Sequence, residues 1–323
     1  MSRVLSSIFN KSAKIKILFS AIFIVLPHIS SAEPATVFSL TADGGVFYGL
    51  ANEYVYYGGK RISHLEWDEK NTPFARFSAI LSLKNFFVRG EALSAFASNS
   101  GFIRDYDFLT ESGGAVSSYS EHDAHIDFHN IFGLEAGYAL TFRNFRFDLS
   151  AGFRYNARKW TGSEGFIQYP PYNEPWTGDE PKTSISGAVI TYEQKISNLY
   201  IRLNCSRQIS NQFKIGVTGE FHPYFWVKSL DSHIDRKKQF LDSMQGGYGG
   251  SAGLYAQYKP YAASRWNVKA GFSWEKTAEI NGSAASRETG LYLEENPFKT
   301  VRNYSSGFES FLFIFFAGIT FEL

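Results

Sequence analysis

From residue 33 onward, apolar and polar residues alternate with a period of two in one segment after another. One such segment covers residues 132–142 and another covers residues 147–155, with Arg143-Asn144 as a turn between them. This alternation predicts antiparallel β-strands whose two faces meet different surroundings. The pattern recurs over residues 199–206, 213–222, 252–258, 266–274 and 311–323. We therefore predict an all-β chain.

The polar faces of these strands carry charged residues near their centres, such as Glu135 and Arg154. In a soluble barrel or sandwich the inner face is apolar, but here the aromatic and aliphatic face is the continuous one. An outer apolar face and an inner charged face are typical of a barrel that spans a membrane. We predict a transmembrane antiparallel β-barrel.

Two kinds of connection alternate along the chain. Short turns fall at Lys84-Asn85, Arg143-Asn144, Ser210-Asn211 and residues 260–265, and long polar segments fall at residues 50–62, 99–123, 160–187, 229–247 and 280–303. These connections predict ten strands, with both ends of the barrel domain on the short-turn side. In outer-membrane barrels the short turns face the periplasm, so we expect the long loops outside the cell.

The first 32 residues differ from the rest. Arg3, Lys11, Lys14 and Lys16 form a basic region, an apolar stretch covers residues 17–26, and Ser30-Ser31-Ala32 follows. The apolar stretch is too short to cross a bilayer as a helix, and the pattern is that of a secretory signal peptide. We expect a signal peptide over residues 1–32 and a single barrel domain over residues 33–323.

Composition narrows the class of protein further. An aromatic content of 17% and a hydrophobic content of 44% exclude a disordered chain. The single cysteine, Cys205, excludes a disulfide framework and a cysteine-based zinc site. The formal charge of +1 changes to −3 when the four basic residues of the leader are removed. Neither value suggests nucleic acid as a partner.

Two short motifs carry candidate chemistry where strands run into long loops. They are Asp105-Tyr106-Asp107 and Asp231-Ser232-His233, and in an extended chain the outer residues of each motif share one face. Asp231 would orient His233 as a general base, while Asp105 and Asp107 would share a proton and position a water. The alternative is that both motifs are solvated surface. A bulge near Ser229 is needed to bring Asp231 to the inner face.

Three histidines and two aspartates close together in the sequence could form a metal site. His122, His125 and His129 lie close to Asp123 and Asp127 in the sequence. However, His125, Asp127 and His129 continue the inward-facing set that contains Glu135, so we predict polar residues of the barrel lumen instead. No metal site is expected.

Several motifs together resemble the omptin family of outer-membrane proteases, over essentially the whole chain after the leader. They are Glu53-Tyr54-Val55-Tyr56, the segment Gly59-Lys60-Arg61-Ile62-Ser63-His64-Leu65-Glu66-Trp67, Asp105-Tyr106-Asp107, Ser120-Glu121-His122, Ala151-Gly152-Phe153, Tyr192-Glu193-Gln194-Lys195 and Asp231-Ser232-His233. The resemblance implies an aspartic-type endopeptidase in the outer membrane, with its active site facing outward. It implies that Asp105, Asp107, Asp231 and His233 form the catalytic site.

The resemblance also implies substrate and lipid contacts. Omptins prefer basic residues at the cleavage site, and Glu53 matches one acidic residue that receives the basic side chain, but Ser229 stands where the second is expected. Asp235 and Glu121 are candidates to restore that charge. On the outer wall, Arg154, Arg158 and Lys195 are candidates to bind lipopolysaccharide, on which activity would then depend, although the family signature after Ala151-Gly152-Phe153 is not kept. Outer-membrane lipid and polypeptides with basic residues are thus the expected partners.

We therefore predict an endopeptidase that hydrolyses surface or extracellular polypeptides. One alternative is a barrel that kept the fold but serves as an adhesin or a structural protein. Another is a narrow channel. Retention of all four catalytic residue types disfavours the first, and ten strands leave little room for the second.

Overall fold

The computed structural model describes residues 36–109, 114–171, 174–289 and 296–323. The predicted signal peptide therefore lies outside the described residues. Within the described ranges all regular structure is β-strand, and no helix there is long and apolar enough to cross a membrane.

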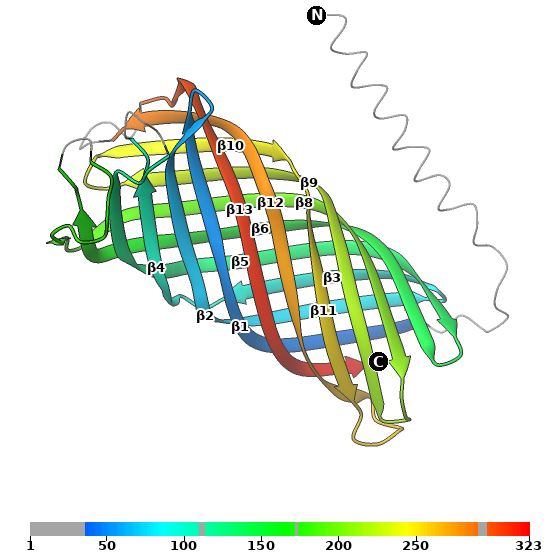
Figure 1. Cartoon of the computed structure of the whole chain (residues 1–323). Coiled ribbons are helices and arrows are strands. Elements are labelled where there is room, and N and C mark those ends of the chain that lie inside the picture. Colours follow the sequence, from blue (N-terminus) through cyan, green and yellow to red (C-terminus); the bar gives the residue numbers. More distant parts are fainter. Residues whose placement is uncertain (1–35, 110–113, 172–173, 290–295) are drawn as a thin grey trace, which may run out of the picture. The chain divides into compact units, whose positions relative to one another are not determined.

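The strands follow one another along the chain and are long (Figure 1). Their bounds are β1 Thr36–Tyr57, β2 Lys60–Leu83, β3 Phe86–Ala95, β4 Ser98–Asp107, β5 Ser118–Phe142, β6 Phe145–Gln168, β7 Thr183–Ser184, β8 Ala188–Gln208, β9 Phe213–His233, β10 Lys238–Gly246, β11 Gly249–Tyr258, β12 Trp266–Glu288 and β13 Lys299–Glu322.

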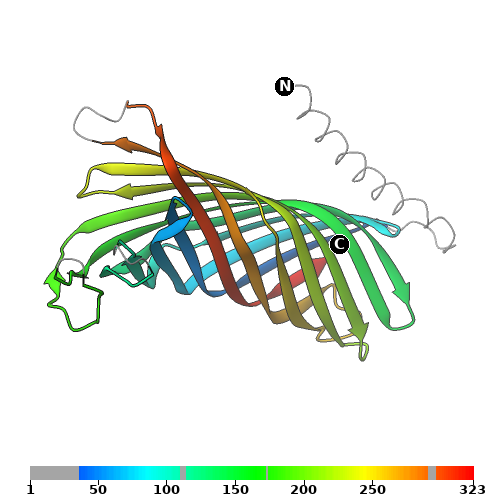
Figure 2. The same ribbon diagram turned by 45° about the horizontal axis from the view of Figure 1, so that its top comes forward.

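Antiparallel pairing closes these strands into a barrel (Figures 1 and 2). Successive crossings of the barrel pair with each other: β3 and β4 each lie between β2 and β5, and β10 and β11 each lie between β9 and β12. β1 pairs with both β2 and β13, which joins the two ends of the sheet. β3 and β4 together cross the barrel once, as do β10 and β11, while β7 is a two-residue strand on the edge of β6. The described strands thus make ten crossings, and the all-β barrel prediction is confirmed.

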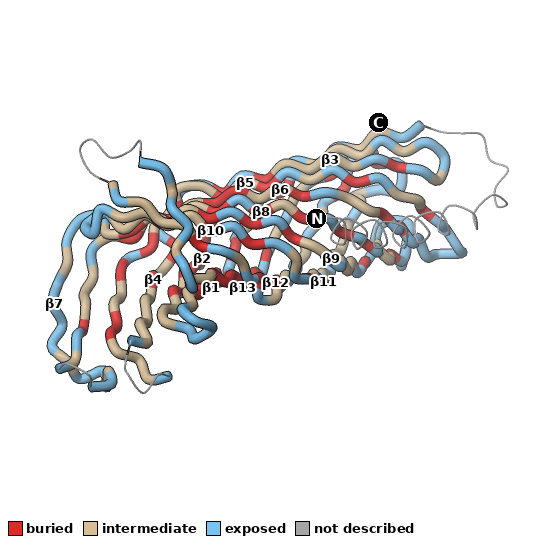
Figure 3. The backbone as a smooth tube through the Cα atoms, turned by 90° about the horizontal axis from the view of Figure 1, so that it is seen from above, coloured by how far each residue is buried: buried red, intermediate tan, exposed pale blue. Residues whose placement is uncertain are grey.

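The alternation of the sequence appears in the structure as alternating burial along each strand (Figure 3). On β5 and β6, Leu134 and Phe153 are exposed while Glu135 and Arg154 are buried. Exposed aromatic and aliphatic residues form a belt over the half of the barrel nearest the short turns, and Tyr48, Trp226 and Trp274 lie at its far edge. Beyond this edge the outer wall becomes charged, as at Arg104, which lies 3.6 Å from Glu66. This second half of the barrel therefore projects beyond the apolar belt.

The four predicted short turns lie between strands as expected, but most of the segments predicted as long loops consist largely of strand. The segment 160–187 is the exception and does contain a long connection, because β6 ends at Gln168 and β8 begins at Ala188. β1 reaches Tyr57 and β2 begins at Lys60, so only Gly58-Gly59 connects them, with φ of 57° and 80°. Similarly, β9 continues to His233 and β10 begins at Lys238. The prediction of long loops was wrong there, because polar residues on the outer wall of a projecting barrel have the composition of a loop.

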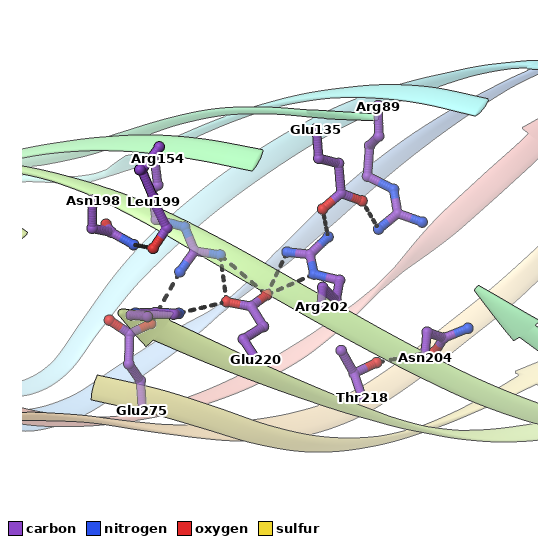
Figure 4. A network of polar contacts seen from close by, with 11 residues as sticks. Arg89, Glu135, Arg154, Asn198, Leu199, Arg202, Asn204, Thr218, Glu220 and Glu275 are labelled. Carbon is purple, nitrogen blue, oxygen red and sulfur yellow. Dashed lines mark hydrogen bonds and ion pairs between the residues drawn. The ribbon is translucent and has the colours of Figure 1, made fainter. Parts of the chain in front are cut away.

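Ion pairs fill the interior at the level of the apolar belt (Figure 4). Glu220 on β9 lies 3.0 Å from Arg154 on β6 and 2.5 Å from Arg202 on β8. Arg202 also lies 2.9 Å from Glu135, which is 2.7 Å from Arg89 on β3. Because this network joins opposite walls, it occupies the lumen and argues against an open channel.

An apolar layer lies between this network and the end of the barrel that carries the two acidic motifs. Its largest members are Trp67, Trp160, Tyr192, Phe225 and Phe308, each no more than 2% exposed. It draws residues from nearly every crossing of the barrel, so it closes the interior beneath the projecting end. Any site above it therefore has an apolar floor.

One prediction about the histidines was wrong. The register between β5 and β6 shifts between Ile126 and Phe128, a β-bulge that reverses the facing of the residues before it. His129 is fully buried and bonded to Glu69, whereas Asp127 pairs with Lys159 at 3.2 Å and both of those side chains are partly exposed. His125 and Asp127 are therefore outer-wall residues.

Candidate active site

The two acidic motifs are the last residues of β4 and β9. Around the barrel these strands are separated by β5, β6 and β8 on one side and by five crossings on the other, so the motifs approach from different walls. Asp105 and His233 line the same cavity, which has a volume of about 130 Å³. The structure thus brings the two motifs together at the projecting end.

A β-bulge directs the second motif inward. On β9, Phe221 is exposed but Phe225 is buried, although both occupy odd positions. The register with β8 shifts in this interval, which contains Pro223, a residue that cannot donate to the ladder. From Phe225 onward Ser229, Asp231 and His233 face the interior. The expected bulge exists, but it lies at Pro223 and not near Ser229.

Asp231 and His233 form a direct pair. The Nε2 atom of His233 lies 2.7 Å from Oδ2 of Asp231, whose side chain is 5% exposed. Burial alone would lower the pKa of His233, but the charge of Asp231 and its hydrogen bond outweigh burial, so the pKa lies above its usual value. The carboxylate therefore orients the ring and stabilises its charged form.

Asp105 and Asp107 face this pair from β4. Ser63 donates a hydrogen bond to Asp105 at 3.2 Å, and Ser118 donates one to Asp107 at 2.8 Å. Burial, with repulsion from Asp107, raises the pKa of Asp105 to about 7, against the opposing effect of the His233 charge. Burial also raises the pKa of Asp107. Two close carboxyls of this kind hold a shared proton near neutral pH.

Apolar side chains surround the polar groups of the cavity. Leu65, Ile103 and Ile190 line it beside Asp105 and His233, and Arg236 lines it from the turn after β9. Ile103 precedes Asp105 by two positions and belongs to the apolar layer, so the catalytic candidates stand directly on that floor. A site of this kind limits water around the charged groups, which strengthens their electrostatic effects.

The two predicted substrate-binding residues lie together below Asp231. Glu53 on β1 is 2% exposed, and Ser229 on β9 is 1% exposed. Burial and the charges of Asp231, Asp242 and Asp105 raise the pKa of Glu53 well above its usual value. The electrostatic influence of Asp242 identifies it as a further acidic residue of this region.

Sequence reasoning missed Asp242. It lies on β10, opposite Ser229, and the Oγ atom of Ser229 donates to Oδ2 of Asp242 at 3.3 Å. Glu121, one of the two expected substitutes, accepts a hydrogen bond from Tyr119 and lies 3.4 Å from Arg104 on the outer wall. Asp235, the other, is an exposed residue of the turn after β9 and lines the cavity of Asp105 and His233, but it is not among the charges that act most strongly on Glu53. Only the register of β9 with β10 reveals Asp242.

Two of the three residues predicted to bind lipopolysaccharide face the wrong way. Arg154 is 8% exposed and pairs with Glu220, and Arg158 is 3% exposed and lies 3.4 Å from Glu69. Both side chains are neutralised inside the barrel and cannot meet lipid, so their assignment was wrong. Lys195 does face outward, with a 56% exposed side chain beside Glu193.

Within the described ranges, the histidines other than His233 have structural partners. His122 lies 2.7 Å from the carbonyl oxygen of Glu164 and 3.2 Å from Oγ of Ser120. Among the residues that the structure describes, no group of three or more histidine, cysteine or acidic side chains is arranged to hold a metal ion.

Comparisons with known proteins agree with the barrel fold and identify the family. A profile of the omptin family matches residues 34–323. The plasminogen activator of Yersinia pestis is 27% identical over 263 residues, which cover 80% of each chain. The crystal structure of the outer membrane protease OmpT from Escherichia coli superposes with a TM-score of 0.80 at 21% identity, covering 92% of this chain and 99% of that one.

A closed ten-crossing barrel with an apolar outer belt and an acidic, histidine-containing cavity defines an outer-membrane β-barrel protease. The family match extends over nearly the whole chain, from residue 34 to residue 323. The chain belongs to the omptin family, and its substrates are polypeptides.

Proposed function

We propose that this protease hydrolyses peptide bonds with a water activated between the Asp231–His233 pair and the Asp105–Asp107 pair. The observation that carries the proposal is the cavity that Asp105 and His233 share. Each has an acidic partner two positions away on the same strand, Asp107 for Asp105 and Asp231 for His233. Neutral His233 accepts a proton from the water while the oxygen attacks the carbonyl carbon. Asp231 stabilises the imidazolium that forms.

The Asp105–Asp107 pair acts on the carbonyl oxygen of the peptide bond that is cleaved. The shared proton of Asp105 and Asp107 hydrogen-bonds the carbonyl oxygen as negative charge develops there. Breakdown of the tetrahedral intermediate transfers the proton of His233 to the leaving nitrogen. The products are one carboxylic acid and one amine, and both pairs return to their starting protonation states.

Position within the barrel supports an outward-facing site. The four residues lie at the end opposite the short turns and beyond the apolar belt. Short turns face the periplasm in barrels of this kind, so the cavity opens to the cell exterior. We infer that the enzyme cleaves surface or extracellular polypeptides, and that buried Glu53 favours basic residues beside the cleaved bond.

Peptide hydrolysis by defined variants tests the mechanism. The refolded protein should cleave a quenched peptide containing Arg-Arg, and His233→Ala and Asp105→Ala should each lower kcat by about 100-fold or more. Asp123→Asn, at an exposed outer-wall position, is the matched control. Unchanged cleavage by both active-site variants would refute the mechanism, and wild-type protein without peptidase activity would favour the structural or adhesive alternative.

A glycolipid contact is a separate proposal, based on Lys195. Lys195 lies opposite Lys228 in the register of β8 and β9, and exposed Trp226 lies two residues before Lys228 at the edge of the apolar belt. Two outward lysines beside an interfacial aromatic fit the phosphate of a lipopolysaccharide. The double variant Lys195→Gln/Lys228→Gln should be activated less by added lipopolysaccharide. If the wild-type protein is fully active without lipopolysaccharide, the proposed dependence on glycolipid is refuted.

A further inference from the structure

A buried acidic well lies beneath the proposed catalytic groups. Glu53 on β1 and Asp242 on β10 are 2% and 3% exposed, and the charge of Asp231 acts on both of them. Burial and the charge of Asp231 raise the pKa of Asp242 to about 7. Three carboxyl groups therefore share one enclosed region.

Of these three carboxyl groups, Asp231 pairs with His233 at 2.7 Å, whereas Glu53 and Asp242 form no ion pair within the described part of the chain. The charged groups with the largest effects on Glu53 are Asp231, Asp242 and Asp105, all of them acidic. Trp67 and Tyr192, which are fully buried, and Met244, at 2% exposure, belong to the apolar layer at the same level. Raised pKa values mean that Glu53 and Asp242 hold protons while they lack a cationic partner, and a positive charge supplied from outside would let both ionise.

Unused hydrogen-bonding capacity points in the same direction. Oε2 of Glu53 and Oδ1 of Asp231 are buried and have no hydrogen-bond partner. Nearly every buried polar atom in a folded protein has a partner, so these two oxygens are available to a ligand. An ammonium or guanidinium group carries both the charge and the donors that the two oxygens lack.

The position of Asp242 allows it to replace the second acidic residue that is expected at position 229, where this chain has a serine. Ser229 and Asp242 are register partners on adjacent strands, and the hydrogen bond of 3.3 Å between their side chains directs the carboxylate toward the face that Ser229 occupies. The carboxylate of Asp242 on β10 therefore lies close to the place that an acidic side chain at position 229 of β9 would occupy.

We propose that Asp242 is a specificity-determining residue which, with Glu53, binds the lysine or arginine side chain beside the cleaved bond. This inference rests on the proposed function of the neighbouring catalytic groups. Ser229 carries no charge, and Asp242 supplies the second carboxylate in its place. The acidic pair of the binding site is then Glu53 on β1 and Asp242 on β10.

Paired peptides test the proposal directly. One peptide carries arginine at the cleavage site and the other carries citrulline, which has a similar shape but no charge. Asp242→Asn should raise KM for the arginine peptide by about 30-fold and change KM for the citrulline peptide little, because a buried charge partner is lost only for arginine. The double variant Ser229→Asp/Asp242→Ser, which returns the acid to β9, should recover the preference for arginine.

Controls separate this inference from the catalytic mechanism. Asp123→Asn removes an exposed outer-wall carboxylate and should leave the ratio of the two KM values unchanged. In the His233→Ala background, binding of acetyl-arginine amide should still weaken when Asp242→Asn is added, which reports the well without catalysis. If Asp242→Asn raises KM for both peptides equally, or leaves the preference for the arginine peptide unchanged, the role of Asp242 is refuted. This holds even when His233 is confirmed as the base.

Discussion

Asp231 controls the charge of His233 through one hydrogen bond of 2.7 Å. Its carboxylate raises the pKa of His233 against the effect of burial, so the neutral base forms only above the usual histidine pKa. Asp231→Asn should therefore shift the acidic limb of the kcat/KM profile to lower pH, by about one unit, while kcat falls about 100-fold or more. A profile measured from pH 4 to pH 9 tests this. An acidic limb that stays in place would show that another group sets it.

Asp242 should make stability depend on pH. Its pKa is about 7 in the folded barrel but near 3.9 in an unfolded chain. The unfolded state therefore loses this proton first, and stability falls as pH rises from about 4 to 7. Asp242→Asn should reduce this fall, measured as the thermal midpoint in detergent at pH 4 and pH 8. An equal fall in both proteins would mean that Asp242 does not contribute.

At the scale of the strand, bulges place the site. The register between β4 and β5 shifts between Asn99 and Gly101, just before the segment that carries Asp105, and the Pro223 bulge precedes Asp231 on β9. A shift of one residue reverses the facing of everything that follows. Both strands that carry the proposed catalytic residues therefore depend on a local irregularity below the site.

Gly101 is the sensitive residue of the β4 bulge. Its φ is 114°, and an added Cβ would lie 2.6 Å from Oδ2 of Asp68, which also accepts a hydrogen bond from the amide of Phe102. Gly101→Ala should lower stability by about 1–3 kcal/mol and reduce kcat/KM about tenfold by displacing Asp105. Gly90→Ala is the matched control, because nothing lies within 4 Å of a Cβ there. Equal activity of the two variants would contradict this account.

Alternation was enough to predict the barrel and the shared face of each acidic motif, because spacing by two fixes side-chain direction within a strand. The same alternation places Arg154 on the interior face, and so contradicts the lipid contact that the family resemblance implies for this residue. A bulge on β9 follows from the change of parity before Asp231, but its position at Pro223 does not, and the bulge between Ile126 and Phe128 has no clear signal in the sequence. Asp242 was unpredictable because its partner depends on the register across a turn, not on neighbours in the sequence.

At the scale of the whole barrel, Glu220 links three strands. It bonds Arg154, Arg202 and His222, and its side chain is 5% exposed. Glu220→Gln removes one of two counter-charges from each of two buried arginines, because Arg154 keeps Glu275 and Arg202 keeps Glu135. It should cost about 3 kcal/mol, measured by denaturant unfolding in detergent. Asp127→Asn breaks a partly exposed pair with Lys159 and should cost about 1 kcal/mol or less. Similar losses in the two variants would show that the interior network is not a main source of stability.

Closure of the barrel has a consequence for what the enzyme is able to cut. The strands that carry Asp105 and His233 are hydrogen-bonded on both sides in a ring without a free edge, so the site has no hinge about which to open. All adaptation then falls to the substrate, which must present an extended segment that fits between fixed walls. Such an enzyme selects by local flexibility as much as by sequence: a basic residue in a loose loop is accessible, and the same residue within a stable helix is not.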